Sequence, residues 1–203
     1  MKKHKDKSKT QVSKTYVLRY GDITVRLIDT LNIGGTHGIE KVRENFQNIM
    51  THLSPFDEIH AICVLLTSNS HGISAMFDYI FKELLTNLHE DACVDVVFCF
   101  TNGRRTFFQL RDTLKTLLRF VNAFGTKLTH EAVYCVDNEA VRFIAAIKCG
   151  LKCTDGQYKR FCDSWHISAK ENKRLLEYIS ALQPLKIKKN QLTSSEARRM
   201  ILP

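Results

Sequence analysis

The sequence predicts an α/β fold, with a mainly parallel sheet that carries helices on both faces and a helical extension toward the carboxyl end. Apolar runs at 59–67, 94–101 and 132–136 are of strand length and rich in β-branched or aromatic residues, and we expect the first two to be buried. Segments with helical periodicity separate these runs. Strands that alternate with helices are typical of parallel units joined by right-handed crossovers.

A β-hairpin is predicted before these runs, with strands at 16–20 and 23–29 joined by Gly21-Asp22. An amphipathic helix follows it and ends near Pro55. Its apolar face consists of Ile39, Val42, Phe46, Ile49, Met50 and Leu53.

Further helices are predicted at 73–88, 110–121 and 141–147, where the apolar residues are best explained as core packing. The longest predicted helix covers 158–182, begins after about Thr154 and stops before Pro184. A short last helix is expected at 194–201.

The charge of the chain is concentrated at its two ends. The net charge is +9, and lysines crowd the first 14 residues and the last 20. Two solvated ends explain this pattern best, although contact with nucleic acid, anionic lipid or a nuclear import receptor is the functional alternative. No aromatic residues alternate with the lysines, so we expect no nucleic-acid partner. We also expect no membrane span, because no apolar run approaches the ~20 residues that one requires.

Three of the seven cysteines, Cys63, Cys99 and Cys135, lie within the apolar runs, where cysteine behaves as a small hydrophobic residue. This favours a reducing compartment without disulfides, and hence a cytoplasmic protein. The basic amino-terminal segment leaves a nuclear location open.

A possible zinc motif, C-x3-C-x8-C-x3-H, is formed by Cys149, Cys153, Cys162 and His166. Cys162 also lies on the apolar stripe of its predicted helix, which favours a packing role. We therefore expect no zinc.

Polar pairs end three predicted strands: Asp29-Thr30, Thr101-Asn102 and Asp137-Asn138. Ligands of open α/β sheets bind at the carboxyl ends of the strands. We therefore expect any binding site to lie among these pairs.

The order and spacing of these elements resemble the P-loop GTPase class, in particular its septin-like and immunity-associated branch. The stretches that carry the resemblance are KTYVLRYGDITVRLIDT, IHAICVLL, FKELLTNLH, VVFCFTNGR and YCVDNEAVRFIAAIKCG. The resemblance implies three regions: a basic tail with a switch-like segment at 1–14, a partial G domain at 15–150 and a helical extension at 151–203.

The resemblance also implies GTP or GDP and Mg²⁺ as ligands. Thr10 matches the switch threonine that binds Mg²⁺, and Asp29 matches the aspartate that holds Mg²⁺ through water. The residues implied to bind the nucleotide are Asp29, Thr30, Thr101, Asn102, Arg104, Asp137 and Asn138.

The sequence departs from the family pattern at the positions that bind phosphate and base. No G-x-x-x-x-G-K-[ST] motif occurs, and Leu31 and Asn32 replace the Pro-Gly of the D-T-P-G element. Arg104 stands where an aspartate accepts hydrogen bonds from guanine, and arginine has only donors. We therefore expect impaired nucleotide binding and no GTP hydrolysis by this chain alone, and no residue is assigned a catalytic role.

Three functions remain open on this evidence. The first is a GTPase-like domain with impaired guanine-nucleotide binding. The second is a nucleotide-free protein-interaction module, or pseudo-GTPase, whose partner is a second copy or another G domain. The third is a basic nucleic-acid adaptor, which requires an affinity that falls steeply with salt.

A further expectation is that Met1 is not the ancestral start of the domain, because Thr10 already matches the switch segment. In the family, the missing first strand lies between two others in the sheet.

Overall fold

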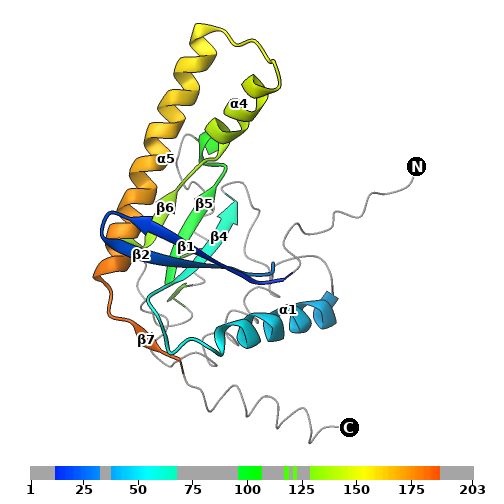
Figure 1. Ribbon diagram of the computed structural model, residues 1–203, viewed down its shortest axis with the longest axis vertical. Coiled ribbons are helices and arrows are strands. Elements are labelled where there is room, and N and C mark those ends of the chain that lie inside the picture. Colours follow the sequence, from blue (N-terminus) through cyan, green and yellow to red (C-terminus); the bar gives the residue numbers. More distant parts are fainter. Residues whose placement is uncertain are drawn as a thin grey trace, which may run out of the picture. The chain divides into compact units, whose positions relative to one another are not determined.

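The computed structural model describes residues 12–32, 38–67, 96–106, 117–118, 121–122 and 129–187 (Figure 1). The chain divides into two compact units. The described part of the first unit is 12–32, 38–57 and 186–187, and the other described residues belong to the second unit. The helices predicted at 73–88 and 194–201 lie outside the described residues. Of the helix predicted at 110–121, Leu117 and Val121 are described, and both are buried in helical turns.

The predicted hairpin is confirmed in the first unit. Strand β1 (Lys14–Tyr20) pairs antiparallel with β2 (Ile23–Asp29), and the register runs from Lys14 opposite Asp29 to Tyr20 opposite Ile23. Gly21 has a φ of 58°, a conformation that glycine adopts without steric cost. The hairpin turn therefore requires the glycine that the sequence places there.

Helix α1 (Gly38–Leu53) also belongs to the first unit and is amphipathic as predicted. Its buried apolar residues include Val42, Ile49, Met50 and Leu53. Polar contacts join it to the hairpin segment. Asn48 Oδ1 accepts hydrogen bonds from the backbone N–H and the hydroxyl of Ser13, and the Asn45 amide donates to the Asn32 carbonyl at 2.9 Å.

The second unit contains a parallel sheet in the order β4-β5-β6, formed by Ile62–Thr67, Val96–Thr101 and Val133–Cys135. All residues of β5 before Thr101 are buried, which explains its continuous apolar run. With α1 and the two helices of the second unit, the described residues form an α/β structure with three helices and a small parallel sheet of three strands.

The expectation of one buried strand at 59–67 is wrong. Strand β3 (Glu58–Ile59) pairs with β7 (Leu185–Lys186), and the chain leaves strand conformation before β4 begins at Ile62. Within β4 only Val64 is buried, whereas Cys63 and Leu65 are exposed. The reason is that Cys63 and Leu65 lie on one side of this edge strand and Val64 on the other, and the side of Cys63 and Leu65 is left uncovered by the described residues.

Two helices follow β6 as predicted. Helix α4 (Glu139–Lys148) packs on α5 (Asp155–Ala181) through Phe143 and Phe161, whose rings stack with centroids 4.1 Å apart. A capping box of Thr154 and Gln157 begins α5. Farther along, Leu175, Tyr178 and Ile179 of α5 pack on a buried cluster of the sheet, formed by Val97, Cys99 and Tyr134. None of the helices in the ranges described above is both long and apolar enough to cross a membrane.

Candidate functional site

The loop after β5 folds back onto the end of β6. The Thr101 hydroxyl donates to the Leu66 carbonyl at 3.2 Å, and Asn102 has a φ of 57°. This left-handed conformation is one that asparagine adopts more readily than most residues. The Gly103 N–H then donates to the Val136 carbonyl at 3.1 Å. These contacts bring the ends of two neighbouring parallel strands together.

The carboxylate of Asp137 holds this corner together. Its Oδ2 accepts a hydrogen bond from the Arg104 N–H at 3.0 Å, and its Oδ1 accepts one from the Glu139 N–H at 2.7 Å. The second contact places a negative charge at the positive end of α4. Asn138 is the N-cap residue, but its side chain makes no capping hydrogen bond. Both oxygens of Asp137 are therefore committed to backbone N–H groups of the chain itself.

The guanidinium of Arg104 is also held within the protein. It forms an ion pair with Glu139 and lies over the Phe161 ring, with Cζ 5.1 Å from the centroid. The Arg104 side chain is 29% exposed and that of Glu139 is 36% exposed, so the pair is partly shielded from water. Arg104 thus joins the β5 loop to both α4 and α5.

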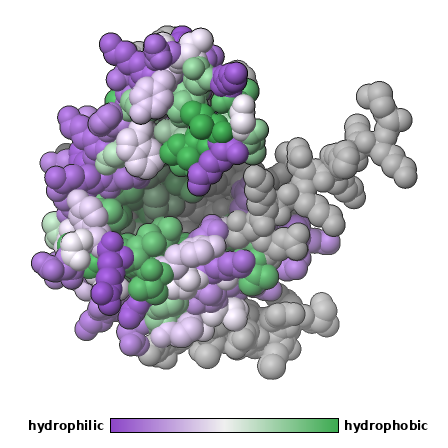
Figure 2. Space-filling view, turned by 45° about the horizontal axis from the view of Figure 1, so that its top comes forward, coloured by the Kyte–Doolittle hydropathy of each residue, from purple (hydrophilic) through white to green (hydrophobic). Residues whose placement is uncertain are grey.

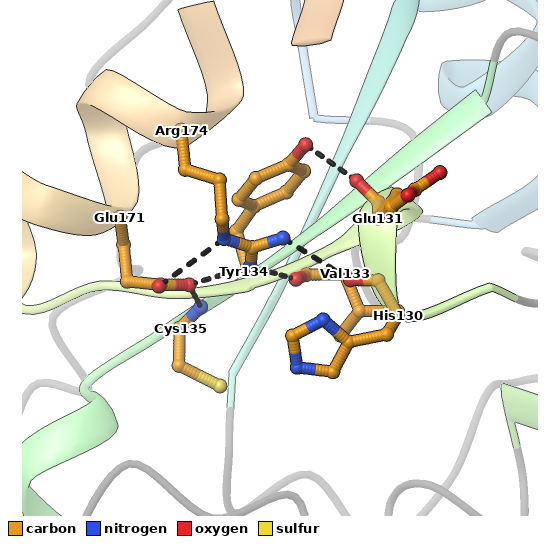
Figure 3. Close-up of polar contacts among 7 residues, drawn as sticks. All are labelled: His130, Glu131, Val133, Tyr134, Cys135, Glu171 and Arg174. Carbon is orange, nitrogen blue, oxygen red and sulfur yellow. Dashed lines mark hydrogen bonds and ion pairs between the residues drawn. The ribbon is translucent and has the colours of Figure 1, made fainter. Parts of the chain in front are cut away.

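The outer edge of β6 is closed by side chains of α5 (Figure 3). The guanidinium of Arg174 donates to the carbonyls of His130 and Val133. It also binds the Glu171 carboxylate, at 3.3 Å from Nε and 2.8 Å from Nη2. Glu171 in turn accepts a hydrogen bond from the Cys135 N–H at 3.4 Å.

Ser168 continues this arrangement one turn earlier, because its Oγ accepts a hydrogen bond from the Asp137 N–H at 2.9 Å. We call Ser168, Glu171 and Arg174 the edge clamp. An unpaired strand edge invites pairing with another chain. The edge clamp occupies the outer backbone groups of Val133, Cys135 and Asp137, so this edge is protected.

The contacts of the edge clamp were not predicted from the sequence. Its three residues recur every third position on α5, which was a usable signal of one shared helix face. Polar residues at that spacing are also typical of a solvated helix face, so only the structure shows that they contact β6.

Tyr134 lies beneath the edge clamp, with the Arg174 Cζ 4.1 Å from its ring centroid and its hydroxyl donating to the Glu131 carbonyl (Figure 3). Burial raises the pKa of Tyr134 from 10 to about 12, although the nearby Arg174 charge opposes this shift. As the pH rises, the Tyr134 hydroxyl loses its proton in the unfolded chain before it does so in the folded chain. The contribution of the protonated Tyr134 to folding stability is therefore complete below pH 10 and is lost as the pH rises to about 12.

We expect Tyr134 to titrate near pH 12 when phenolate absorbance is recorded, and Tyr134→Phe should remove that step. As a control, Tyr16→Phe should leave it in place, because Tyr16 is 46% exposed on the hairpin. Loss of the step in Tyr16→Phe, or its persistence in Tyr134→Phe, would contradict the assignment.

Two of the strand cysteines are in contact, with Sγ atoms of Cys63 and Cys99 3.4 Å apart. This contact lowers the pKa of Cys63, while the same contact and burial raise the pKa of Cys99. Cys99 is buried as expected, whereas Cys63 is exposed.

The residues of the C-x3-C-x8-C-x3-H motif make local contacts. Cys149 is the C-cap residue of α4, and the Cys153 Sγ lies 3.3 Å from Gln157 Oε1. His166 Nδ1 lies 2.7 Å from the Cys162 carbonyl oxygen. Across the described ranges, no three His, Cys, Asp or Glu residues gather where they could hold a metal ion.

The remaining residues implied by the resemblance lie elsewhere. Asp29 ends β2 and Thr30 follows it, both in the first unit, whereas Thr101, Asn102, Arg104, Asp137 and Asn138 belong to the second unit. Thr10 lies outside the described residues.

Among the described residues, the corner at the ends of β5 and β6 lacks the aspartate that reads guanine in the family pattern. Guanine presents N–H donors that require an acceptor, and Arg104, at the position where the family has an aspartate, offers donors alone; each Asp137 oxygen already accepts one hydrogen bond from the backbone. For Mg²⁺, the described residues provide Asp29 without a cluster of further ligands. A scan against protein-family models and a search of curated proteins find no match to this chain.

Proposed function

We propose that this chain is a nucleotide-free protein-interaction module on a GTPase-like scaffold. The scaffold in this proposal has a mainly parallel sheet with helices on both faces, and the protein acts in the cytoplasm. The corner at the ends of β5 and β6, where the family binds nucleotide, here holds the strands, the loop and the helices together. Binding another protein then replaces nucleotide chemistry as its function.

The observation that carries this proposal is that both carboxylate oxygens of Asp137 bind backbone N–H groups of the chain. These oxygens accept hydrogen bonds from the Arg104 and Glu139 N–H groups, and the Arg104 guanidinium is held by Glu139 and Phe161. These contacts fix the orientation of the Asp137 carboxylate, so turning it toward a guanine base would break hydrogen bonds to the backbone. Leaving those N–H groups unpaired costs about 1–3 kcal/mol each, which opposes nucleotide binding.

Guanine-nucleotide binding is the second candidate. It is favoured by the gathering of Thr101, Asn102, Arg104 and Asp137 at the carboxyl ends of two parallel strands, where ligands bind in open α/β sheets. In this alternative, the Asp137 carboxylate gives up its hydrogen bonds to the Arg104 and Glu139 N–H groups and accepts hydrogen bonds from the guanine base instead.

The variant Asp137→Asn separates the two candidates. If Asp137 is structural, neither wild type nor variant binds fluorescent GDP or GTP with Mg²⁺. The variant then loses about 1–3 kcal/mol of unfolding free energy, because asparagine keeps only one acceptor oxygen and turns its NH2 group toward one of the two backbone N–H groups. The matched control is Asp163→Asn, an exposed aspartate on α5, which should unfold like wild type. Micromolar binding by wild type that Asp137→Asn weakens would refute the proposed function and support the second candidate.

A further inference from the structure

The outward side of α4 is apolar. Val141 and Ile144 are 57% and 51% exposed, and Ala145 is exposed beside them, so residues at positions i, i+3 and i+4 share one uncovered side. Ala140 and Phe143 of the same helix are buried. The apolar surface of α4 is therefore wider than the part that the described residues cover.

The apolar surface continues past the carboxyl end of α4. Ile147 is 44% exposed and Leu151 is 60% exposed. Figure 2 shows apolar residues reaching the surface in the upper part of the view, where Figure 1 places α4 and the start of α5. We call Val141, Ile144 and Ala145 the α4 face, and Ile147 and Leu151 are exposed near its carboxyl end. Single exposed apolar residues are ordinary, but several gathered on one short segment are typical of interaction sites.

The charged residues around the α4 face are mainly basic. Arg142 flanks it, Lys148 shares its outer side seven residues after Val141, and Lys152 follows Leu151. All three are exposed, and they form no ion pair with any residue that the structure describes. The acidic residue of the helix, Glu139, is engaged by Arg104.

The positive charge around the α4 face indicates which kind of partner it binds. Packing two copies of the α4 face together would place Arg142, Lys148 and Lys152 of each copy close to those of the other, which is unfavourable. A helix that carries carboxylates beside its apolar stripe matches both features of the surface. Helices dock in this way through anchors at i, i+3, i+4 and i+7.

We propose that the α4 face binds an acidic amphipathic helix of another protein. The apolar stripe of that helix packs on Val141 and Ile144, and its carboxylates pair with Arg142 and Lys148. This inference rests on the proposed function, because it identifies the docking surface of the interaction module and the chemistry of its partner.

The test uses the full chain and two synthetic helical peptides of equal length. Both carry leucines at i, i+3, i+4 and i+7, and they differ only in having glutamate or lysine at the flanking positions. Fluorescence anisotropy should show saturable binding of the glutamate peptide, and binding of the lysine peptide should be weaker by about tenfold or more. The substitution Ile144→Glu should weaken the glutamate peptide by a similar factor.

Reversing the charge provides the decisive variant without touching buried residues. The double variant Arg142→Glu and Lys148→Glu should prefer the lysine peptide, whereas the control Lys159→Glu and Arg160→Glu, on the exposed side of α5, should keep the wild-type preference. Failure of the glutamate peptide to bind, or the same preference in all variants, overturns the proposal.

Binding to phosphatidylserine vesicles in place of the peptide also overturns it. Titration of the same samples with nucleotide tests the proposed function separately. Nucleotide binding would refute that function regardless of whether the peptides bind.

Discussion

Replacing Arg174 with methionine should lower the free energy of unfolding of the second unit by about 2–4 kcal/mol. The methionine keeps the apolar stem of the side chain but removes the hydrogen bonds to the His130 and Val133 carbonyls. It also leaves the Glu171 carboxylate, whose side chain is 22% exposed, without its cation. Urea unfolding followed by the fluorescence of Trp165, the single tryptophan and a residue of α5, measures this loss.

A neighbouring lysine provides the matched control for Arg174. Lys173 pairs with Glu177 at 3.6 Å on the exposed side of the same helix, and its side chain is 64% exposed. Lys173→Met should change the stability by less than about 1 kcal/mol, because exposed ion pairs contribute little. Equal losses in Arg174→Met and Lys173→Met would show that the edge clamp does not stabilise the sheet.

Replacing Phe100 with alanine should lower the free energy of unfolding by about 3–5 kcal/mol. Phe100 is fully buried in β5, the central strand, and aligns with Leu66 on one side and Cys135 on the other. Truncation removes a large apolar side chain and leaves a cavity that the two neighbouring strands cannot close. The same urea titration with Trp165 fluorescence measures the loss.

The control for Phe100 is Leu65→Ala on β4. Leu65 is 68% exposed, so its truncation removes little buried surface and should change the stability by about 0.5 kcal/mol or less. If Leu65→Ala were as damaging as Phe100→Ala, the side of β4 that carries Leu65 would have to be covered in solution.

The elements predicted best are those whose local sequence pattern is compatible with only one secondary structure. The run that became β5 is apolar at nearly every position, as a central parallel strand requires, and Gly21 marks a turn that needs a positive φ. The end of the long helix before Pro184 follows from proline chemistry, and its start at Thr154 follows from a capping box. These features depend on residues close together in the chain.

Features that depend on distant residues were missed or misjudged. The run at 59–67 is as apolar as a buried strand, but its burial depends on what lies beside β4, and Cys63 and Leu65 are exposed. The contacts of Asp137 were likewise hidden, because Arg104 reaches it only after the β5 loop folds back. The sequence placed Thr101 and Asp137 each at the end of a predicted strand, but it could not show that Asp137 bonds to the backbone.

These contacts give the corner at the ends of β5 and β6 a structural role in our account. Asp137 holds the loop and the start of α4, while Arg104 joins that loop to α4 and α5. A corner with this many internal contacts can keep its scaffold without a bound base. In our proposal, interaction takes place at the α4 face, where apolar side chains and basic groups are both exposed.

The most direct test of this account is the thermal unfolding of the chain with and without saturating Mg²⁺ and GDP or GTP. We predict the same midpoint temperature in all samples, because Asp137 remains bound to the Arg104 and Glu139 N–H groups. A ligand present at 100 times its dissociation constant stabilises a protein by about 2.7 kcal/mol, or about 5–10 °C for a chain of this size. A rise of that size with guanine nucleotide, absent with the adenine nucleotide, would contradict the account.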